Sequence, residues 1–311
     1  MRALVVGGAG FIGSHLTERL LAGAEVTVFD NLSVGKPEFL SHALEGACTL
    51  IKSDALDLPA LERAMAGHDT VFHFAANPEA RWGLENPRLD LEQGTIATWN
   101  VLEAMRRTGA KRLVFASSGT MYGDTMDNCA EGDLGKLPIS LYGASKFACE
   151  GLISAFVECF GLSAWIYRFG NVVGPRGTHG AALDFLNKLK NNPEELEVLG
   201  DGRQSKPYVH VNDCVGGVLF GLEHARERLN IHNIAPPDFS SVRRIAELCV
   251  AASPYPNARI RYTGGDRGWP GDVPHSRLNA EKLGALGYRV SMTSDQAVEA
   301  AVRALAVQVF G

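Results

Sequence analysis

The regular alternation of short apolar runs with longer helical patterns is the feature that most restricts the fold of this chain. From residue 1 to about residue 168, six β-rich runs without strict polar alternation are separated by helical stretches. This order is typical of a parallel sheet with helices on both faces, whose strands are buried on both sides. The expected strands are residues 3–6, 25–29, 48–52, 70–74, 112–116 and 163–167, and the main helices are residues 12–22, 58–66, 91–108 and 141–160.

The second part of the chain has a different character. After Gly174 the alternation stops, and Gly, Pro and Asn become frequent, which predicts a smaller lobe at the carboxyl ends of the strands. Ligands of open α/β sheets bind at that edge. We therefore expect a Rossmann-type, doubly wound α/β domain over residues 1–170, with residues 207–232 returning to it. Residues 171–206 and 233–311 should form a smaller α/β substrate-binding lobe.

The composition favours a small-molecule partner. The formal net charge is -5 and the basic residues are spread along the chain, so nothing favours nucleic acid or an anionic membrane surface. The six cysteines contain no Cys-x-x-Cys pair and no matching histidine pattern, which favours reduced thiols in a cytoplasm and no metal site. No cleavable signal pattern is present, and no apolar stretch is long enough to cross a bilayer. These features predict a cytoplasmic protein.

Glycines follow the first expected strand and open the first expected helix. Gly7, Gly10 and Gly13 permit a tight turn, let the backbone approach a pyrophosphate, and let the helix pack against the strand. The helix N-terminus then supplies free amides and a favourable dipole for phosphates. Glycine turns also occur at purely structural ends, so the pattern needs support from its context.

Residues at the ends of the next strands supply that context. Asp30 ends the second strand, where a carboxylate can accept hydrogen bonds from the adenosine ribose and would repel a 2′-phosphate. Asp54 follows the third strand, and Phe74-Ala75-Ala76 ends the fourth with small residues where a flat cofactor must pass. The alternative role of Asp30 is a turn-forming pair with Asn31. Together these residues predict NAD, rather than NADP, as the cofactor.

Three polar residues near the fifth strand predict a redox centre. Tyr142 and Lys146 are four residues apart in a helical stretch, so their side chains project from the same face. A tyrosine phenol has a pKa near ~10 and is a poor base at neutral pH. A neighbouring ammonium and a positive nicotinamide ring would favour the phenolate. Ser118, at the end of the fifth strand, can share a hydrogen bond with the phenol and a substrate hydroxyl.

On these residues the chain resembles the extended short-chain dehydrogenases/reductases, specifically the UDP-sugar 4-epimerase group of the NAD-dependent epimerase/dehydratase family. The resemblance covers nearly the whole chain. It implies a Tyr base, a Lys that lowers the pKa of the phenol and holds the nicotinamide ribose, and an assisting Ser, which map onto Tyr142, Lys146 and Ser118. The motifs that carry it are residues 7–13, 30–32, 54, 74–76, 117–123, 142–146, 168–176 and 200–211.

The positions between Ser118 and Tyr122 discriminate between reactions of the family. Similar dehydratases carry an Asp-Glu pair here, and decarboxylating relatives keep the Glu, whereas this chain has Gly119 and Thr120. The resemblance therefore implies NAD-dependent epimerisation of a nucleotide sugar, UDP-glucose and UDP-galactose at C4. The open alternatives are a UDP-hexuronate or UDP-N-acetylhexosamine 4-epimerase, a nucleotide-sugar dehydratase or reductase, and a non-catalytic NAD-binding scaffold.

The resemblance also assigns binding residues. Lys206 stands where the family usually has an arginine, so it loses the bidentate fork, and Arg267 precedes the usual arginine position, now Trp269, by two residues. Similar proteins suggest a homodimer through residues 91–108 and 141–160. The implied substrate contacts are Ser118, Thr120, Tyr142, Asn171, Lys206, Tyr208, Arg267 and Asp272. The implied cofactor contacts are Gly7, Gly10, Phe11, Ile12, Gly13, Asp30, Asn31, Asp54, Ala55, Phe74, Ala75, Ala76, Ser117, Tyr142, Lys146 and Phe169.

Overall fold

The computed structural model describes residues 1–46, 48–124, 128–133 and 137–311. The chain forms two compact units, each built from segments that are separate in the sequence. The first unit comprises Met1–Met121, Leu141–Arg168 and Val218–His232, and the second comprises Tyr122–Ser140, Phe169–Gly217 and Asn233–Gly311.

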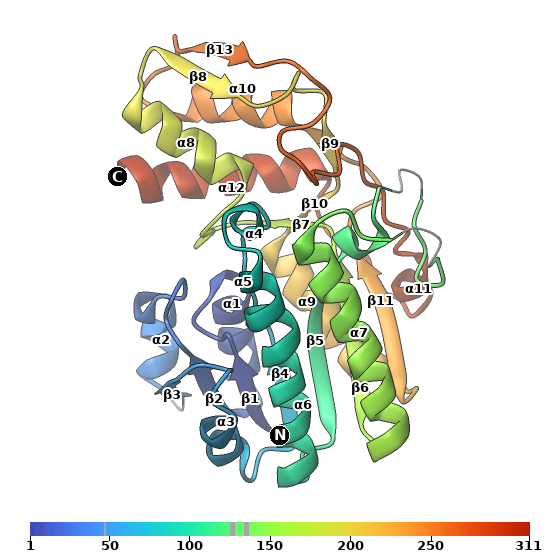
Figure 1. Cartoon of the computed structure of the whole chain (residues 1–311). Coiled ribbons are helices and arrows are strands. Elements are labelled where there is room, and N and C mark those ends of the chain that lie inside the picture. Colours follow the sequence, from blue (N-terminus) through green and yellow to red (C-terminus); the bar gives the residue numbers. More distant parts are fainter. Residues whose placement is uncertain (47, 125–127, 134–136) are drawn as a thin grey trace. The chain divides into compact units, whose positions relative to one another are not determined.

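A seven-stranded sheet lies at the centre of the first unit (Figure 1), in the order β11-β6-β5-β4-β1-β2-β3. The pairs β1–β2, β1–β4, β2–β3 and β4–β5 are parallel. Val5 of β1 lies opposite Val28 of β2 and Phe72 of β4, and all three side chains are buried, as the apolar runs predict. The predicted Rossmann-type fold is confirmed. The strands are β1 Arg2–Val6, β2 Glu25–Asp30, β3 Cys48–Lys52, β4 Thr70–His73, β5 Arg112–Ser118, β6 Ser163–Phe169 and β11 Leu229–Ile234.

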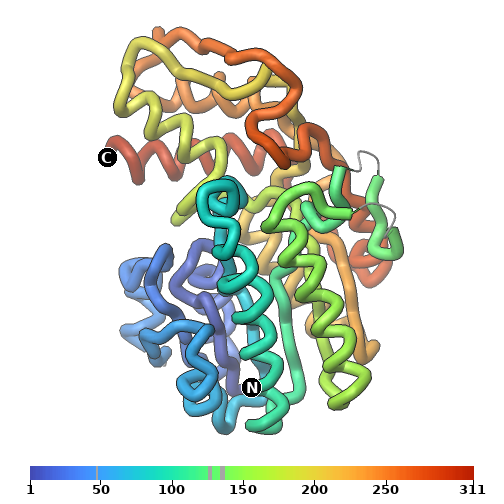
Figure 2. The backbone as a smooth tube through the Cα atoms, in the orientation of Figure 1, coloured from blue at the N-terminus to red at the C-terminus, as the bar shows by residue number. Residues whose placement is uncertain are grey.

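Helices cover this sheet, and α3, α6 and α7 pack side by side along it (Figures 1 and 2). Their apolar stripes form a core with β1 and β5 in which Val101, Leu113 and Ile153 have no exposed surface. The helices that lie in or lead to this unit are α1 Phe11–Leu20, α2 Ser41–Leu44, α3 Leu58–Met65, α4 Trp82–Glu85, α5 Arg88–Asp90, α6 Ala97–Thr108, α7 Leu141–Phe160 and α9 Val211–His224, with 3-10 turns η1 Pro37–Leu40 and η3 Gly119–Tyr122.

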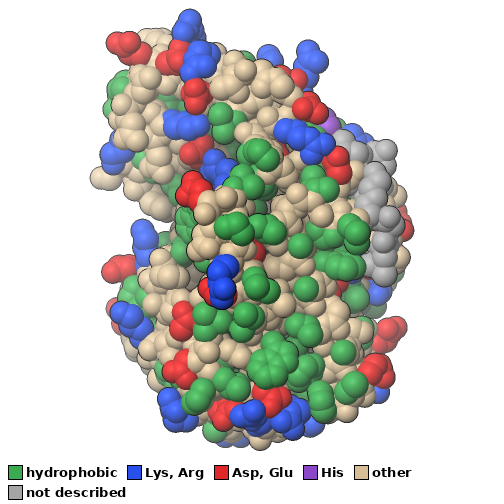
Figure 3. Space-filling model, viewed as in Figure 1, with side chains coloured by type: hydrophobic (Ala, Val, Ile, Leu, Met, Phe, Trp, Pro, Cys, Tyr) green, Lys and Arg blue, Asp and Glu red, His purple; other side chains and the backbone are tan. Residues whose placement is uncertain are grey.

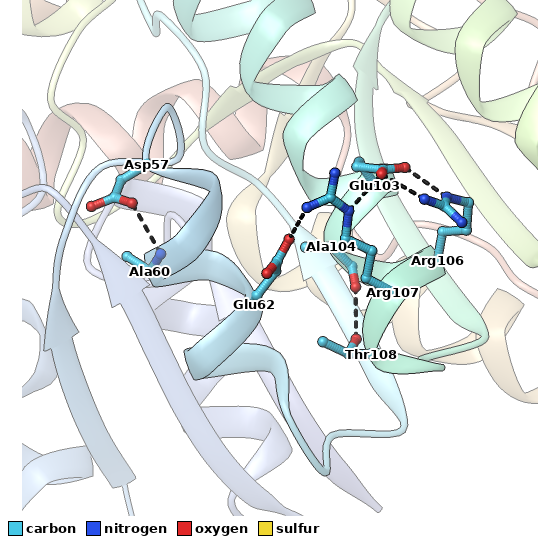
Figure 4. Close-up of polar contacts among 8 residues, drawn as sticks. All are labelled: Asp57, Ala60, Glu62, Glu103, Ala104, Arg106, Arg107 and Thr108. Carbon is cyan, nitrogen blue, oxygen red and sulfur yellow. Dashed lines mark hydrogen bonds and ion pairs between the residues drawn. The ribbon is translucent and has the colours of Figure 1, made fainter.

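Ion pairs tie α3 to α6 away from the sheet (Figure 4). The guanidinium of Arg107 donates to Glu62 on α3 at 2.8 Å and to Glu103 on its own helix at 2.6 Å. Glu103 also accepts from Arg106 at 2.7 Å. Asp57 caps the start of α3 by accepting from the N–H of Ala60.

The helix expected over residues 91–108 is divided in the structure. Leu91–Ile96 forms a π-helical turn, η2, and the α-helix begins at Ala97. A Cβ on Gly94 would lie 2.8 Å from the Oγ of Ser145 on α7, so the glycine allows this turn to approach α7 closely. The local pattern of apolar residues does not distinguish this turn from an ordinary helix.

The second unit has its own core, in which α8, α10 and α12 pack on one another. Residues 207–211 were expected to return to the main sheet. Instead Tyr208–His210 (β10) pairs with Asn171–Val173 (β7), and the strand that joins the main sheet is β11. The other elements are α8 Ala181–Asn191, β8 Glu195–Val198, β9 Ser205–Lys206, β12 Ser240–Ser241, α10 Val242–Ala252, β13 Arg259–Tyr262, α11 Glu281–Ala285 and α12 Ser294–Phe310.

Candidate active site

The predicted glycine turn forms a tight backbone cradle at the end of β1. Gly7 has a φ of +83°, and a Cβ there would lie 2.4 Å from the backbone N of Ala75. A Cβ on Gly13 would lie 2.1 Å from the carbonyl O of Gly7. Helix α1 begins with Gly10 as a cap that has no side-chain hydrogen bond, so no side chain of the cap competes for the first amides. The cradle therefore fits the pyrophosphate of a dinucleotide.

The two acids predicted to contact the cofactor lie at the end of β2 and just after β3. Asp30 accepts from the N–H of Ala9 at 2.9 Å and of Leu32 at 2.8 Å, so it also has the turn role considered for it. Burial raises the pKa of Asp30, and these two bonds oppose the rise. Asp54 accepts from the side chain of Asn31 at 2.8 Å. The carboxylate of Asp30 has further lone pairs for ribose hydroxyls, and its charge disfavours a 2′-phosphate.

The remaining predicted cofactor residues of the first unit lie near the same ends of the strands. The backbone N–H groups of Phe74 and Ala75 donate to the carbonyl of Val6, which holds the end of β4 against the glycine turn. Ala55 is buried beside Asp54, and Phe74, Ala75 and Ala76 are half-buried. Phe169 is buried at the end of β6 and belongs to the second unit.

Ser118, Tyr142 and Lys146 are brought together, as the sequence predicts. Tyr142 lies in the first turn of α7, and the Nζ of Lys146 is 5.7 Å from the centre of its ring. The same Nζ donates to the carbonyl of Ala116 on β5 at 2.7 Å. Ser118, at the end of β5, hydrogen-bonds to the phenol of Tyr142. The strand and the helix thus present all three side chains at one place.

The electrostatics of this centre differ from the simple expectation. Part of Tyr142 is exposed, yet loss of water around the phenol raises its pKa to about 12, against the lowering effect of the bond from Ser118. Burial lowers the pKa of Lys146. The side chains of the protein therefore leave the phenol a weak acid. The part of the predicted shift that depends on a nicotinamide stays a prediction.

Thr120 directs the hydroxyl of Ser118. Its backbone N–H and its side-chain hydroxyl both donate to the Oγ of Ser118, at 3.2 and 3.0 Å. With its lone pairs accepting, Ser118 has its own proton available for Tyr142. Thr120 therefore takes part in the site without carrying a charge.

Sequence reasoning missed two buried acids of this region. Glu150 on α7 accepts from Ser117 and Arg168, and Asp90 accepts from the side chain of Asn77 at 3.0 Å. The position of Glu150, four residues after Lys146, was the available signal, because it places the acid on the same face of the helix as Tyr142 and Lys146. Asp90 has no comparable signal in the sequence.

The predicted substrate residues of the second unit also come together. Asn171 and Tyr208 are register partners on β7 and β10, and the side chain of Asn171 hydrogen-bonds to the phenol. Burial raises the pKa of Tyr208 to about 12, against that bond. Lys206, two residues earlier, pairs with Asp272 at 2.7 Å.

Arg267 joins this cluster through two contacts. One guanidinium nitrogen donates to the carbonyl O of Asp272 at 2.8 Å, and another donates to the carboxylate of Asp124 at 2.8 Å. Asp124 was not predicted from the sequence. Lys206 and Arg267, the two cations among the predicted substrate contacts, therefore already have acidic partners, which hold them in place.

The buried histidine of β4 has a structural role. His73 is fully buried, and burial lowers its pKa to about 3, so it stays neutral while it hydrogen-bonds to Thr98. The six cysteines are free thiols. Among the residues that the structure describes, no cluster of His, Cys, Asp and Glu could hold a metal ion, and no helix is long and apolar enough to cross a membrane.

Comparison with known proteins defines the class. Residues 3–235 match the NAD dependent epimerase/dehydratase family, and the chain belongs to this family of enzymes. The predicted resemblance and the prediction of NAD as the cofactor are confirmed by this match.

The individual relatives include epimerases and a dehydratase, so they do not assign a substrate. The chain is 29% identical over 305 residues to a putative UDP-glucose 4-epimerase of Methanocaldococcus jannaschii, covering 96% of each chain. It is 38% identical to a UDP-galactose 4-epimerase of solved structure, with a TM-score of 0.88 and 100% of each chain covered. It is also 29% identical over 302 residues to a dTDP-glucose 4,6-dehydratase of an Actinoplanes species, covering 93% of this chain and 92% of that one.

Proposed function

We propose that this protein is a nucleotide-sugar 4-epimerase that interconverts UDP-glucose and UDP-galactose. The observation that carries the proposal is the assembled group of Ser118, Tyr142 and Lys146, with uncharged Gly119 and Thr120 beside it. Elimination of water requires a further acid and base next to the tyrosine. Neither Gly119 nor Thr120 carries a carboxyl group, which leaves the simpler cycle of oxidation and re-reduction.

In that cycle Tyr142 removes the proton from the sugar hydroxyl and returns it after the ketone has turned. NAD, which the glycine turn at Gly7 and the carboxylate of Asp30 would hold, would supply a reversible hydride acceptor when bound. Ser118 would donate its one proton to the phenolate, because both of its lone pairs accept from Thr120. Lys146 keeps a positive charge close to the phenol ring while the Ala116 carbonyl holds its Nζ.

The second unit would hold the nucleotide part. Tyr208 and Asn171 present a phenol and an amide from adjacent strands, and Lys206 and Arg267 supply positive charge for two phosphates. The carboxylate of Asp272 accepts from Lys206 and from the N–H of Gly268, and its remaining lone pairs suit ribose hydroxyls. A nucleoside diphosphate sugar matches this combination of cations, amide and acid.

The experiment is an NMR assay of the purified protein, without added cofactor, on UDP-glucose, UDP-N-acetylglucosamine and UDP-glucuronate. We expect UDP-glucose to be converted to UDP-galactose, because the hydride is returned in every cycle and NAD stays bound. Conversion of only one of the other two sugars would select the N-acetylhexosamine or the hexuronate alternative. Unchanged sugars in the presence of added NAD would refute the epimerase assignment.

We further propose a homodimer that forms through η2, α6 and α7. Hydrophobic side chains gather on this face of the first unit in Figure 3, and Trp99 and Phe160 are 42% and 43% exposed. Sedimentation should give a mass about twice that of one chain. Charged substitutions at Trp99 and Phe160 should reduce the measured mass to that of one chain. The large apolar side chains of this face are Leu91, Ile96, Trp99, Leu141, Phe147 and Phe160.

We propose a cytoplasmic location, because six free thiols suit a reducing compartment.

A further inference from the structure

Three successive turns of α7 bind three successive residues of β5. Tyr142, Lys146 and Glu150 are four residues apart and share one face of the helix. Tyr142 hydrogen-bonds to Ser118, Lys146 donates to the carbonyl of Ala116 at 2.7 Å, and Glu150 accepts from the hydroxyl of Ser117 at 2.5 Å. Two of these contacts belong to the proposed chemistry. The third, between Glu150 and Ser117, does not.

The negative charge of Glu150 is already compensated by an ion pair with Arg168. Arg168, from the neighbouring strand β6, donates to one carboxylate oxygen through Nε at 3.0 Å and to the other through Nη2 at 2.7 Å. The side chains of Arg168 and Glu150 are only 2% and 8% exposed, so the pair is buried and geometrically well defined. The bond from Ser117 is therefore not needed to compensate the charge.

What the bond from Ser117 adds is a connection to the backbone that carries Ser118. Ser117 is 2% exposed, and its hydroxyl donates to Glu150 of the buried ion pair. Because Ser118 is the next residue and the last of β5, a rotation of the chain at Ser117 would swing its hydroxyl away from Tyr142. Thr120 holds Ser118 from the other side along the chain.

We propose that Glu150 is a positioning residue of the redox centre, which acts through Ser117 to keep the hydroxyl of Ser118 aligned with Tyr142. The role rests on the proposed function, because it presupposes that Ser118 and Tyr142 act on the sugar. Glu150 touches neither of them. It holds the end of β5 at a fixed distance from the helix that carries the base.

The first test replaces the serine alone. In Ser117→Ala the pair between Glu150 and Arg168 stays intact, so the protein should fold. We expect kcat to fall by about tenfold to a hundredfold, with KM within about twofold, because misplacement by about 1 Å has effects of this size. NAD should stay bound, because the hydroxyl of Ser117 is used by Glu150 and alanine keeps the backbone through which this residue would contact the cofactor. Activity of Ser117→Ala within twofold of the native protein would overturn the proposal.

Two further variants separate positioning from stability. Glu103, on α6 and away from the site, is a comparable acid that pairs with two arginines. Glu103→Gln weakens these ion pairs, so it should lower the melting temperature without changing kcat. Glu150→Gln keeps an oxygen for Ser117 but weakens the pair with Arg168. It should therefore melt at a lower temperature than Ser117→Ala while losing less kcat. If kcat instead follows melting temperature across the three variants, Glu150 has a structural role only.

A crystal structure provides a reading that does not depend on the substrate. In Ser117→Ala with NAD bound, Ser118 should lie outside hydrogen-bond distance of Tyr142, whereas the native protein should keep that bond. An unchanged bond would exclude the positioning role even if none of the sugars tested were turned over. Failure of the native protein in the sugar assay, with the bond lost in the variant, would count against the proposed function alone.

Discussion

The hydroxyl of Thr120 donates a hydrogen bond to the Oγ of Ser118 at 3.0 Å, and the backbone N–H of Thr120 donates a second at 3.2 Å. Similar dehydratases and decarboxylating proteins carry a glutamate at this position, and the uncharged threonine makes this double donation instead. It directs the proton of Ser118 toward Tyr142. We therefore expect the ionisation of the phenol to depend on Thr120, which acts on it through Ser118.

Replacement of Thr120 by valine should move the pH dependence of turnover. Loss of the hydroxyl leaves Ser118 freer to rotate, so the phenolate loses a donor and the pKa of Tyr142 rises further. The limb on which activity increases with pH should shift upward, and a shift of one unit corresponds to about tenfold less activity near pH 7. The charged and titratable groups that act on Tyr142, namely Lys146, Asp90 and Cys149, are unchanged in this variant.

The measurement is the pH profile of kcat/KM for the native protein, Thr120→Val and Thr120→Ser. The serine variant keeps a hydroxyl and should retain the native profile. Identical profiles for valine and native proteins would show that Thr120 does not act through Ser118.

Replacement of Tyr142 by phenylalanine should abolish most turnover while leaving NAD in place. The loss should be on the order of a hundredfold to ten-thousandfold, because a positioned general base contributes this much. Tyr167→Phe is the matched control: it removes a buried phenol of the first unit that donates to Val218, so it should reduce thermal stability but not activity. Near-native activity of Tyr142→Phe, with NAD bound, would support a different base.

Lys206 should contribute to nucleotide affinity rather than to chemistry. Lys206→Met removes a cation that now pairs with Asp272, so KM for the UDP-sugar should rise about tenfold with little change in kcat. Lys206→Arg should restore affinity through its bidentate fork. Lys188→Met is the control, because Lys188 forms a more exposed pair with Asp184 in the same unit. An equal effect of both methionine variants would argue against phosphate binding at Lys206.

Glu103 should make stability depend on pH in the acid range. Hydrogen bonds and charge from Arg106 and Arg107 lower its pKa from 4.5 to about 2 (Figure 4). Because the folded pKa is below the unfolded one, this stabilisation is complete above about pH 4.5 and disappears as pH falls through about 2. Urea unfolding of native protein and Glu103→Gln should differ most near pH 6 and progressively less from pH 4 downward. A difference that is constant with pH would contradict this assignment.

Much of the fold and the redox centre follows from local patterns. The apolar runs at β1 to β6 predict strands to within about two residues, because strands buried on both faces must be apolar throughout. The four-residue spacing from Tyr142 to Lys146 places both on one helix face for the same reason of local geometry. The glycines at the end of β1 predict the phosphate cradle because a Cβ cannot fit there.

Other features depend on residues that are far apart in the chain. Glu150 meets Ser117 and Arg168 across 33 and 18 positions, and Arg267 meets Asp124 across 143. Periodicity contains no information about such pairs. The π-helical turn at Gly94 arises in the same way, from its close contact with Ser145 on another helix.

The sequence by itself determined the order of strands and helices, the glycine turn after β1 and the helix face shared by Tyr142 and Lys146, because each depends on neighbours within a few residues. Only the tertiary structure decided which residues Glu150 binds, which cations are already paired, and which strand completes the sheet. These outcomes depend on which side chains are buried together, and burial is a property of the folded chain as a whole.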